Sequence, residues 1–407
     1  MISVGLDLGN SKISCIVCDI KSKNQVKLLT FVTRPTNSIK KSVITDISKI
    51  KTDIKEIILQ VAKESQTEIA SVRLNVPVVN SLTSYSHSEI LVSNEKISDL
   101  HLKKSINKSE ILDPIDNYKV IHQSIINFEL DKQSHIIDPR GMYGDNLKVY
   151  FYKLAIRENY IKTINNIFEQ LNIQIENFIP SPLSSALATL KNDEKALGSI
   201  TIDLGAGSTS ISVFENNKLI FLDAIPIGGH HITTDIARGF STSIESAERL
   251  KTLYGSVITN PSDDFELIDV HILGAEGNQF NQINRSQLNS IIKPRVEETL
   301  ELIRQKLKEY YLDKKPIRNL VLTGGGSLLE GIEEYAETIF DSKTRVSKLN
   351  SLLGLDDKFN KPQFSQTVGL MYYNEKDYRF DFLPENQGKI EKKSLFRRFS
   401  SWLDHYI

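Results

Sequence analysis

Apolar residues near the start of the chain fall into short runs that are typical of β-strands. Runs over 2–8, 13–20 and 26–32 are separated by turn residues and predict a three-stranded meander. Five apolar residues then recur at helical spacing: Ile50, Ile54, Ile57, Ile58 and Val61. A further strand is expected over 71–77, so this part of the chain alternates strands and helices.

The same pattern returns in the second part of the chain. Helices are expected over 159–171 and 182–190, and a second meander begins near residue 199 and has its third strand over 219–227. Further helices are expected from about 231 and over 243–254, 286–311 and 327–339, with strands over 173–178 and 319–322. The chain is therefore predicted to be an α/β protein built from two related halves.

A change of composition separates an inserted part from the first half. Residues 82–154 are rich in Ser, Asn, His and Lys, and they are expected to form short strands and one short helix. The predicted boundaries are 1–81 and 155–197 for the first domain, 82–154 for the insert, 198–228 and 316–384 for the second domain, 229–315 for its smaller subdomain, 385–394 for a linker and 395–407 for a terminal helix.

Composition and charge limit the class of protein. The 407 residues are 40% apolar and 25% charged, as in soluble globular proteins. The net charge of −1 provides no general attraction for nucleic acid, so no nucleic-acid partner is expected. The N-terminus lacks a signal-peptide pattern, and no run of 18 apolar residues predicts a membrane span. We therefore expect a cytoplasmic protein.

Cys15 and Cys18 are the only cysteines and form a Cys-x-x-Cys pattern within an expected strand. Residues three positions apart in a strand point to opposite faces, and no second pair of ligands completes a zinc site. We therefore expect two structural cysteines rather than a metal or redox site.

Two segments share one sequence pattern: residues 5–12 read GLDLGNSK, and residues 201–209 read TIDLGAGST. Each ends an apolar strand with an aspartate, turns at glycine and enters the next strand through small hydroxyl residues. Glycine allows a phosphate to approach the backbone, and successive inward N–H groups bind anions. The pair predicts two half-sites that close on one nucleotide. The alternative is two structural hairpins.

These turns supply the predicted phosphate-binding residues, which are Gly9, Asn10, Ser11, Lys12, Gly205, Ala206, Gly207, Ser208 and Thr209. Asp7 and Asp203 end the two strands and are expected to hold Mg²⁺ through water, because Mg²⁺ gives up its hydration shell reluctantly. Neither the G-x-G-x-x-G fingerprint of dinucleotide-binding βαβ units nor a Gly-Lys-Ser/Thr phosphate loop is present.

Two further features are expected to contact the nucleotide. Gly324, Gly325 and Gly326 lie between an expected strand and helix, where the backbone can approach a base or ribose and a helix N-terminus faces phosphate. Glu248 and Lys251 share one helix face and are expected to clamp the ribose or adenine. The alternative for this pair is a solvated ion pair.

The end of the chain has an amphipathic pattern with flanking basic residues. Residues expected at a membrane surface are Leu395, Phe396, Arg397, Arg398, Phe399, Trp402, Leu403 and Tyr406. A helix of this kind lies in the bilayer interface, with its basic residues near anionic lipid. The alternative is a helix docked on the protein's own core.

The order of these motifs resembles that of the actin-like ATPases and, among them, the bacterial cell-division family FtsA. The resemblance rests on SPLSSA at 181–186, IPIGGHHITTDIA at 225–237, AERLKTLYG at 247–255, IKPRVEE at 292–298, VLTGGG at 321–326 and DPRGMYG at 138–144. It implies an actin-like, ribonuclease-H-like duplicated two-domain fold with an FtsA-type insert in the first half and a C-terminal amphipathic helix.

The resemblance also implies a function. FtsA proteins bind ATP and Mg²⁺, polymerise, and tether filaments of the tubulin-like protein FtsZ to the cytoplasmic face of the cell inner membrane at the division site. They also recruit later division proteins such as FtsN. The C-terminal peptide of FtsZ is expected on the smaller subdomain, with Arg295 and Arg304 as basic contacts.

The sequence departs from that of many actin relatives at the position of the residue that activates the attacking water. Ser181 stands where many actin relatives place a glutamate or glutamine that orients the attacking water. We therefore expect at most a weak ATPase and assign no catalytic residue. Two alternatives remain: a pilus-assembly scaffold of the PilM type, which shares the fold, and a small-molecule kinase of the same superfamily.

Overall fold

The computed structural model describes residues 1–22, 25–112, 116–273, 280–310, 319–350 and 352–374. The predicted linker and terminal helix, with all eight expected membrane-surface residues, lie outside the described residues. Contacts divide the chain into two units. The first is built from residues 1–84, 115–123 and 152–373, and the second from residues 85–114 and 124–151, within the predicted insert.

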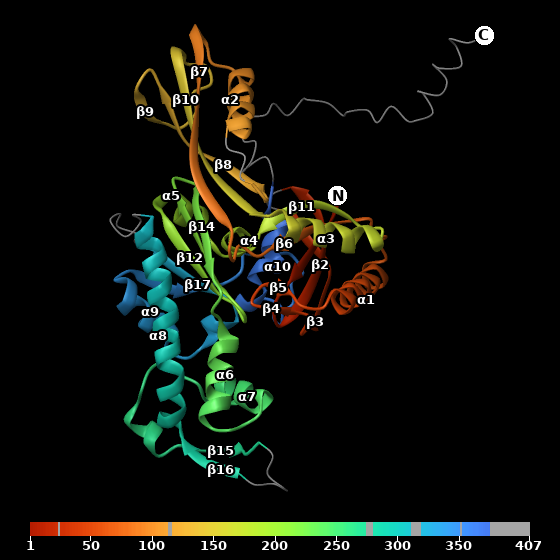
Figure 1. Cartoon of the computed structure of the whole chain (residues 1–407), viewed down its shortest axis with the longest axis vertical. Helices are drawn as coiled ribbons and strands as arrows, with labels where there is room; N and C mark the ends of the chain where they lie inside the picture. Colours follow the sequence, from red (N-terminus) through yellow and green to blue (C-terminus); the bar gives the residue numbers. More distant parts are fainter. Residues whose placement is uncertain (23–24, 113–115, 274–279, 311–318, 351, 375–407) are drawn as a thin grey trace, which may run out of the picture. The chain divides into compact units, whose positions relative to one another are not determined.

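Two five-stranded sheets in the first unit repeat one topology. In the first sheet, β1 (Ile2–Leu8), β2 (Lys12–Ser22) and β3 (Gln25–Pro35) form an antiparallel meander, and β6 (Ser71–Val76) and β11 (Gln174–Pro180) add in parallel beside β1. In the second, β12 (Ser199–Leu204), β13 (Thr209–Glu215) and β14 (Lys218–Ile225) form the meander, and β17 (Asn319–Thr323) and β18 (Lys343–Val346) add beside β12. The strand that carries the aspartate is thus central in both sheets. In Figure 1 the first sheet is found by the labels β2, β3, β6 and β11, and the second by β12, β14 and β17.

Helices α1 (Ile47–Ser65) and α3 (Glu158–Gln170) cover one face of the first sheet. The five apolar residues that predicted α1 are all buried there, in one core with Leu6, Cys15 and Phe168. Asp46 caps the start of α1, because its carboxylate accepts a hydrogen bond from the Lys49 N–H at 2.9 Å. Each such buried aliphatic side chain contributes roughly 1.5–3 kcal/mol.

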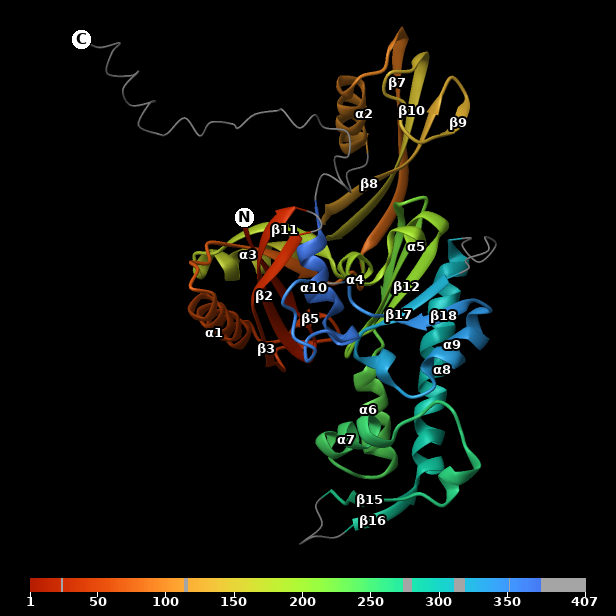
Figure 2. The ribbon, with the colours of Figure 1, turned by 180° about the vertical axis from the view of Figure 1, so that it is seen from behind.

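Helices α4 (Ser181–Thr189) and α10 (Ser365–Tyr372) lie between the two sheets (Figure 2). Helix α10 packs on β1, β2 and β6, whereas α4 packs on β12, β13 and β17. The two helices cross at Gly369, where an added Cβ would overlap the backbone carbonyl of Ser184. A glycine at this position therefore permits the close crossing that joins the two halves.

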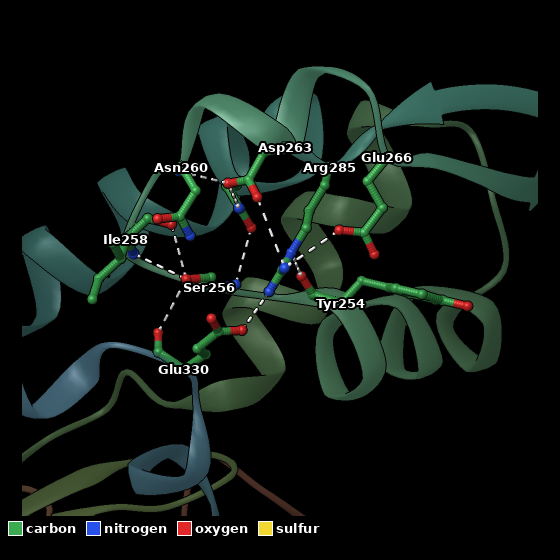
Figure 3. Close-up of polar contacts among 9 residues, drawn as sticks. Tyr254, Ser256, Ile258, Asn260, Asp263, Glu266, Arg285 and Glu330 are labelled. Carbon is green, nitrogen blue, oxygen red and sulfur yellow. Dashed lines mark hydrogen bonds and ion pairs between the residues drawn. The ribbon is translucent and has the colours of Figure 1, made fainter.

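The smaller subdomain of the second half consists of α6 (Gly229–Gly239), α7 (Ile244–Tyr254), η1 (Pro261–Asp264), β15 (Leu267–His271), β16 (Phe280–Asn284) and α8 (Arg285–Glu309). A polar network around Arg285 fastens it to the loop before α9 (Ile332–Phe340) (Figure 3). The Arg285 guanidinium bonds Glu330 in that loop, lies 3.4 Å from Glu266 and donates to the Tyr254 carbonyl at 2.9 Å. Asp263, only 1% exposed, also faces it.

The second unit holds most of a four-stranded sheet in the order β7-β10-β8-β9 and one helix. The elements are β7 (Leu82–Lys96), α2 (Asp99–Leu112), β8 (Tyr118–Leu130), β9 (Gln133–Ile136) and β10 (Tyr143–Arg157). They enclose their own core, which includes Val92, Leu102, Phe128 and Phe151. The sequence predicted short strands here, but β7 and β10 each have 15 residues. Polar residues on their exposed positions concealed this length.

Short elements complete the fold: β4 (Ile39–Lys40), β5 (Val43–Ile44), α5 (Asn192–Leu197), η3 (Gly325–Leu328) and η4 (Pro362–Phe364). Among the described helices, none has an apolar stretch long enough to cross a bilayer.

Candidate functional site

The two predicted hairpins have the same backbone geometry. The Gly9 N–H donates to the Lys12 carbonyl at 3.0 Å, and the Gly205 N–H donates to the Ser208 carbonyl at 3.1 Å. An added Cβ would lie 2.7 Å from the first carbonyl oxygen and 2.8 Å from the second. Because real Cβ atoms do not approach so closely, glycine is required at both turns. The duplication seen in sequence is therefore also a duplication of local structure.

Each hairpin places one carboxylate at the same point of its sheet. Asp7 pairs with Ser14 across β1 and β2, and Asp203 pairs with Ser210 across β12 and β13. Both side chains are buried, with 7% of Asp7 and 3% of Asp203 exposed. Equivalent positions on equivalent strands thus bring two buried carboxylates to one site.

Helix donors hold both carboxylates. Asp7 accepts a hydrogen bond from the Thr367 hydroxyl at 3.1 Å, and Asp203 accepts one from the Gln366 amide at 2.9 Å and one from the Ser185 hydroxyl. Thr367 and Gln366 belong to α10, and Ser185 belongs to α4. The two helices between the sheets therefore fix the orientation of both acids.

Burial dominates the electrostatics of this site. Burial raises the pKa of Asp7 to about 6, although the Thr367 and Asn75 side chains and Lys12 lower it. The pKa of Asp203 is raised for the same reason, against hydrogen bonds from Ser185 and Gln366. Burial also lowers the pKa of Lys12 to about 8, against the attraction of the two carboxylates. Two acids and one ammonium group leave the ionised site with a net negative charge that suits a cation.

The two hairpins touch each other at Asn10 and Gly207, and Ser42, in the turn between β4 and β5, bridges them. The Ser42 hydroxyl lies 3.2 Å from that of Ser208, and the Ser42 N–H donates to the Asn10 side-chain oxygen at 2.8 Å. Gly207 packs against the same Asn10 side chain, which an added Cβ would overlap. Gly207 therefore shapes the closure, and it is not among the residues that line the cavity.

A cavity of about 470 Å³ lies between the two hairpins. Small-molecule sites typically enclose about 300–1,000 Å³, so a nucleotide fits. The cavity is lined by every other residue that the sequence predicted for nucleotide or Mg²⁺, namely Asp7, Gly9, Asn10, Ser11, Lys12, Asp203, Gly205, Ala206, Ser208, Thr209, Glu248, Lys251, Gly324, Gly325 and Gly326. Ser181 also lines it.

Glu248 and Lys251 form a bridge between α6 and α7. The Lys251 ammonium lies 2.7 Å from the Glu248 carboxylate, 2.9 Å from the Thr233 hydroxyl and 3.2 Å from the Gly229 carbonyl. Burial raises the pKa of Glu248, but Lys251 and Thr233 outweigh it, so the pKa is lowered. The Glu248 carboxylate is therefore ionised, and it lines the cavity together with Lys251.

The glycine turn differs from its prediction. The helix expected from residue 327 begins at Ile332, and the glycines lead into the 3-10 turn η3 instead. Gly331 adopts a left-handed conformation, with φ of 77°, and ends the turn before α9 can start. The expected helix N-terminus beside phosphate is therefore absent at these glycines. Gly324, with φ of 81°, packs against Asp203 and Leu204, where an added Cβ would collide with both.

The sequence does not predict the segment Pro362–Thr367, which contributes several contacts to the site. The Lys12 ammonium lies 3.8 Å from the centre of the Phe364 ring, and the Gly324 N–H donates to the Pro362 carbonyl at 3.2 Å. Gln366 and Thr367 bond the two aspartates, as described above. The segment contains neither glycine nor a recognisable motif, so no local signal marks it.

Arg295 and Arg304, predicted to bind an acidic peptide, lie on α8 with partners inside the chain. Arg295 is 2.6 Å from Asp235 and also bonds Glu298. The hydrogen bond to Asp235 raises the pKa of Arg295. Arg304 is 2.8 Å from Glu301. Neither arginine lines the cavity.

The cysteines are core residues of β2. Cys15 lies in the core beneath α1, and Cys18 is also fully buried. Burial raises the pKa of Cys18 to about 12, so its thiol is protonated at neutral pH. Within the described ranges, no three His, Cys, Asp or Glu residues gather to hold a metal ion.

Comparison with known proteins gives three family matches. A model described as "Cell division protein FtsA" matches residues 200–369, and one described as "SHS2 domain inserted in FTSA" matches residues 80–154. A model described as "Type IV pilus assembly protein PilM" matches residues 135–257.

Relatives and solved structures agree with these matches. The cell division protein FtsA of Agrobacterium fabrum is 30% identical, over 90% of this chain and 86% of its own length. The cell division protein FtsA of Escherichia coli is 24% identical, over 98% of this chain and 97% of its own length. Among solved structures, a PilM–PilN pilus biogenesis complex matches with a TM-score of 0.62 at 16% identity, over 91% of this chain and 97% of that one. MreB5 of Spiroplasma citri bound to ADP matches with a TM-score of 0.56 at 14% identity, over 90% and 94%.

Proposed function

Because this chain belongs to the FtsA family of cell-division proteins, we propose that it is an ATP-dependent membrane anchor for division filaments. The actin-like fold and the FtsA-type insert predicted from the sequence are confirmed. The proposal has four parts: binding of ATP and Mg²⁺, polymerisation, binding of FtsZ, and attachment to the membrane.

The observation that carries the proposal is the pair of identical hairpins around one cavity. Turn residues of both hairpins line a common cavity, namely Gly9, Asn10, Ser11, Gly205, Ala206 and Ser208, and Lys12 lines it as well. Backbone donors and a lysine are the groups that bind polyphosphates. The related fold of MreB5 has been solved with ADP and with AMPPNP. We therefore assign the cavity to ATP.

The donors at the strand ends fit a divalent cation. Asp7 and Asp203 are both buried, and Mg²⁺ prefers carboxylate oxygens and water. When bound, Mg²⁺ neutralises phosphate charge at the site. Thr367, Gln366 and Ser185 hold the two carboxylates in place for it.

The remaining predicted contacts position the nucleoside. Glu248 and Lys251 form one wall of the cavity, and Gly324–Gly326 form another, where the absence of side chains allows the base to approach the backbone. Ser181 supplies no carboxylate to activate water, so ATP acts mainly as a ligand for assembly. At most a weak ATPase activity is proposed.

The body of the protein joins filaments to the membrane in this proposal. The smaller subdomain receives the C-terminal peptide of FtsZ, and Arg295 and Arg304 on α8 contact it. Arg295 already bonds Asp235 and Glu298, so an acidic peptide competes with these two carboxylates. The insert contacts neighbouring subunits in the filament and later division proteins such as FtsN.

Residues 395–407 attach the protein to the cytoplasmic face of the cell inner membrane at the division site. The proposal rests on their sequence, in which aromatic and leucine residues share one helical face beside Arg397 and Arg398.

A second candidate function is a scaffold in pilus assembly. The PilM family match over residues 135–257 and the PilM–PilN structure favour it. The two candidates differ in their filament partner, because only a division anchor sediments together with FtsZ.

The test is electron microscopy on lipid monolayers with ATP, with and without FtsZ. We expect the full chain to form filaments on the monolayer and to bring FtsZ filaments to it. The matched variant ends at residue 394 and keeps the whole body. If the truncated chain recruits FtsZ to lipid as well as the full chain does, the anchor proposal is wrong.

A further inference from the structure

The segment Pro362–Tyr373, formed by η4 and α10, contacts the glycine turn and both hairpins of the cavity. Its Pro362 carbonyl accepts from the glycine turn, and its Phe364 ring lies under Lys12 of the first hairpin. Gln366 reaches Asp203 of the second hairpin, and Thr367 reaches Asp7 of the first. Adjacent residues of one helix therefore hold the carboxylates of both halves.

The opposite end of α10 is held by one arginine. The last carbonyls of a helix have no partners within it, and in α10 two of these, from Leu370 and Tyr373, accept hydrogen bonds from Arg73 at 3.2 Å each. The Arg73 side chain is only 13% exposed and lies 3.7 Å from Glu176. Arg73 thus fixes the C-terminal end of α10.

The neighbouring strand allows this close contact. Arg73 on β6 pairs in register with Gly5 on β1. An added Cβ at Gly5 would lie 2.8 Å from the Met371 side chain and 2.9 Å from that of Leu370. The helix end can therefore reach Arg73 only because residue 5 has no side chain.

Helix α10 depends on these outside contacts for its stability. It has eight residues, and no side chain caps its N-terminus. Isolated helices of this length are unstable in water, so α10 forms because it packs on α4, β1, β2 and β6, and the partners at its two ends fix its position between them. The donors on its first turn act on the same carboxylates that a bound cation fixes, and hydrogen bonds to charged acceptors are the stronger ones.

We propose that α10 and Arg73 couple the occupancy of the cavity to the C-terminal segment. A cation at Asp7 and Asp203 fixes the carboxylates to which Gln366 and Thr367 donate, and the helix is held between them and Arg73. The predicted membrane-binding residues follow α10 in the sequence, so a change at the end of this helix alters membrane binding. This inference rests on the proposed function, because it requires that the cavity bind ATP with Mg²⁺.

The structure provides a matched control. Arg345 on β18 donates to the Thr189 carbonyl at the end of α4 and pairs with Glu194 at 2.7 Å. It therefore holds the end of the other crossing helix in the same manner as Arg73 holds α10. Arg73→Gln and Arg345→Gln remove equivalent contacts, but only the first lies on the path to the C-terminus.

The experiment is amide hydrogen exchange of the full chain with and without ATP and Mg²⁺, read on peptides covering residues 368–374. In the wild type we expect the nucleotide to slow exchange about fivefold, the effect of roughly one hydrogen bond. Arg73→Gln should lose this slowing while its ATP affinity, measured by calorimetry, stays unchanged. Arg345→Gln should keep it, and Arg73→Lys, which retains the charge, should restore part of it.

The possible failures are distinct. A wild-type chain that binds no ATP contradicts the proposed function. A wild type that binds ATP, with equal slowing in Arg73→Gln, contradicts the coupling alone. Binding to vesicles of phosphatidylethanolamine and phosphatidylglycerol gives the second readout. ATP should change vesicle binding by the wild type and by Arg345→Gln, and leave that of Arg73→Gln unchanged.

Discussion

Asp7 ends a central strand with 7% of its surface exposed, and burial raises the pKa of its carboxyl to about 6 from an ordinary value of 3.8. The folded protein therefore keeps this proton to a higher pH than the unfolded chain does. The stability that Asp7 contributes is fully present below about pH 4 and is lost as pH rises through 6. At neutral pH, without a cation, the ionised carboxylate destabilises the fold by up to about 3 kcal/mol.

Replacement of this acid should reveal that cost. In EDTA and without nucleotide, we expect Asp7→Asn to raise the free energy of unfolding at pH 7 by about 1–3 kcal/mol, because the amide carries no charge to bury. Its stability should also change less between pH 4 and 6 than that of the wild type. Chemical denaturation across this range measures both effects. Asp269→Asn, on the exposed side of β15, is the control and should leave them unaltered.

At the scale of residues, sequence patterns identified the groups whose role depends on their immediate neighbours. The aspartates and glycines of both hairpins are set by a few adjacent residues, so a short motif is enough to find them. Gln366, Thr367 and Arg73 act on partners far away in the chain. Thr367, for example, bonds Asp7 across 360 positions. Only the folded chain brings such residues together.

Contacts between elements are best illustrated by Arg285, which joins the first turn of α8 to the loop before α9. Its guanidinium faces three carboxylates, those of Asp263, Glu266 and Glu330 (Figure 3). Asp263 is only 1% exposed, and its carboxylate also accepts hydrogen bonds from the Asn260 N–H and the Asn289 side-chain amide. Loss of the arginine leaves these negative charges without their cation.

We expect Arg285→Leu to lower the free energy of unfolding by about 1–2 kcal/mol, because the buried Asp263 loses its cation, whereas water screens the half-exposed Glu266 and Glu330. Arg304→Leu on the same helix removes an exposed ion pair with Glu301 and should cost less than about 1 kcal/mol. Thermal denaturation of the two variants side by side measures the difference. Equal shifts in the two variants would mean that the network around Arg285 contributes no more than a surface pair.

The helices with a strong apolar stripe were predictable at this scale, and the glycine turn was not. Helix α1 buries one face, so spacing alone located it. The expected helix from residue 327 failed because the apolar pattern continues through Gly331, whose left-handed conformation interrupts the helix. The spacing of apolar residues gives no sign that a single residue has a positive φ angle.

The whole molecule is built on duplication, which the sequence also indicated. Two sheets of equal topology put Asp7 and Asp203 at equivalent ends of their central strands, and α4 and α10 cross between them. The relation between the halves was visible because both meanders carry the same motif. The insert was recognised as a separate part by its polar composition, but that same composition hid its two long strands.

The central claim is that the two half-sites bind one ATP between them. Calorimetric titration of ATP with Mg²⁺ into the wild type, Asp7→Asn and Asp203→Asn tests it most directly. We expect one ATP per chain and a loss of affinity of at least about tenfold in each variant, equal to roughly 1.4 kcal/mol. Wild-type affinity in either variant, or two independent sites per chain, would contradict it.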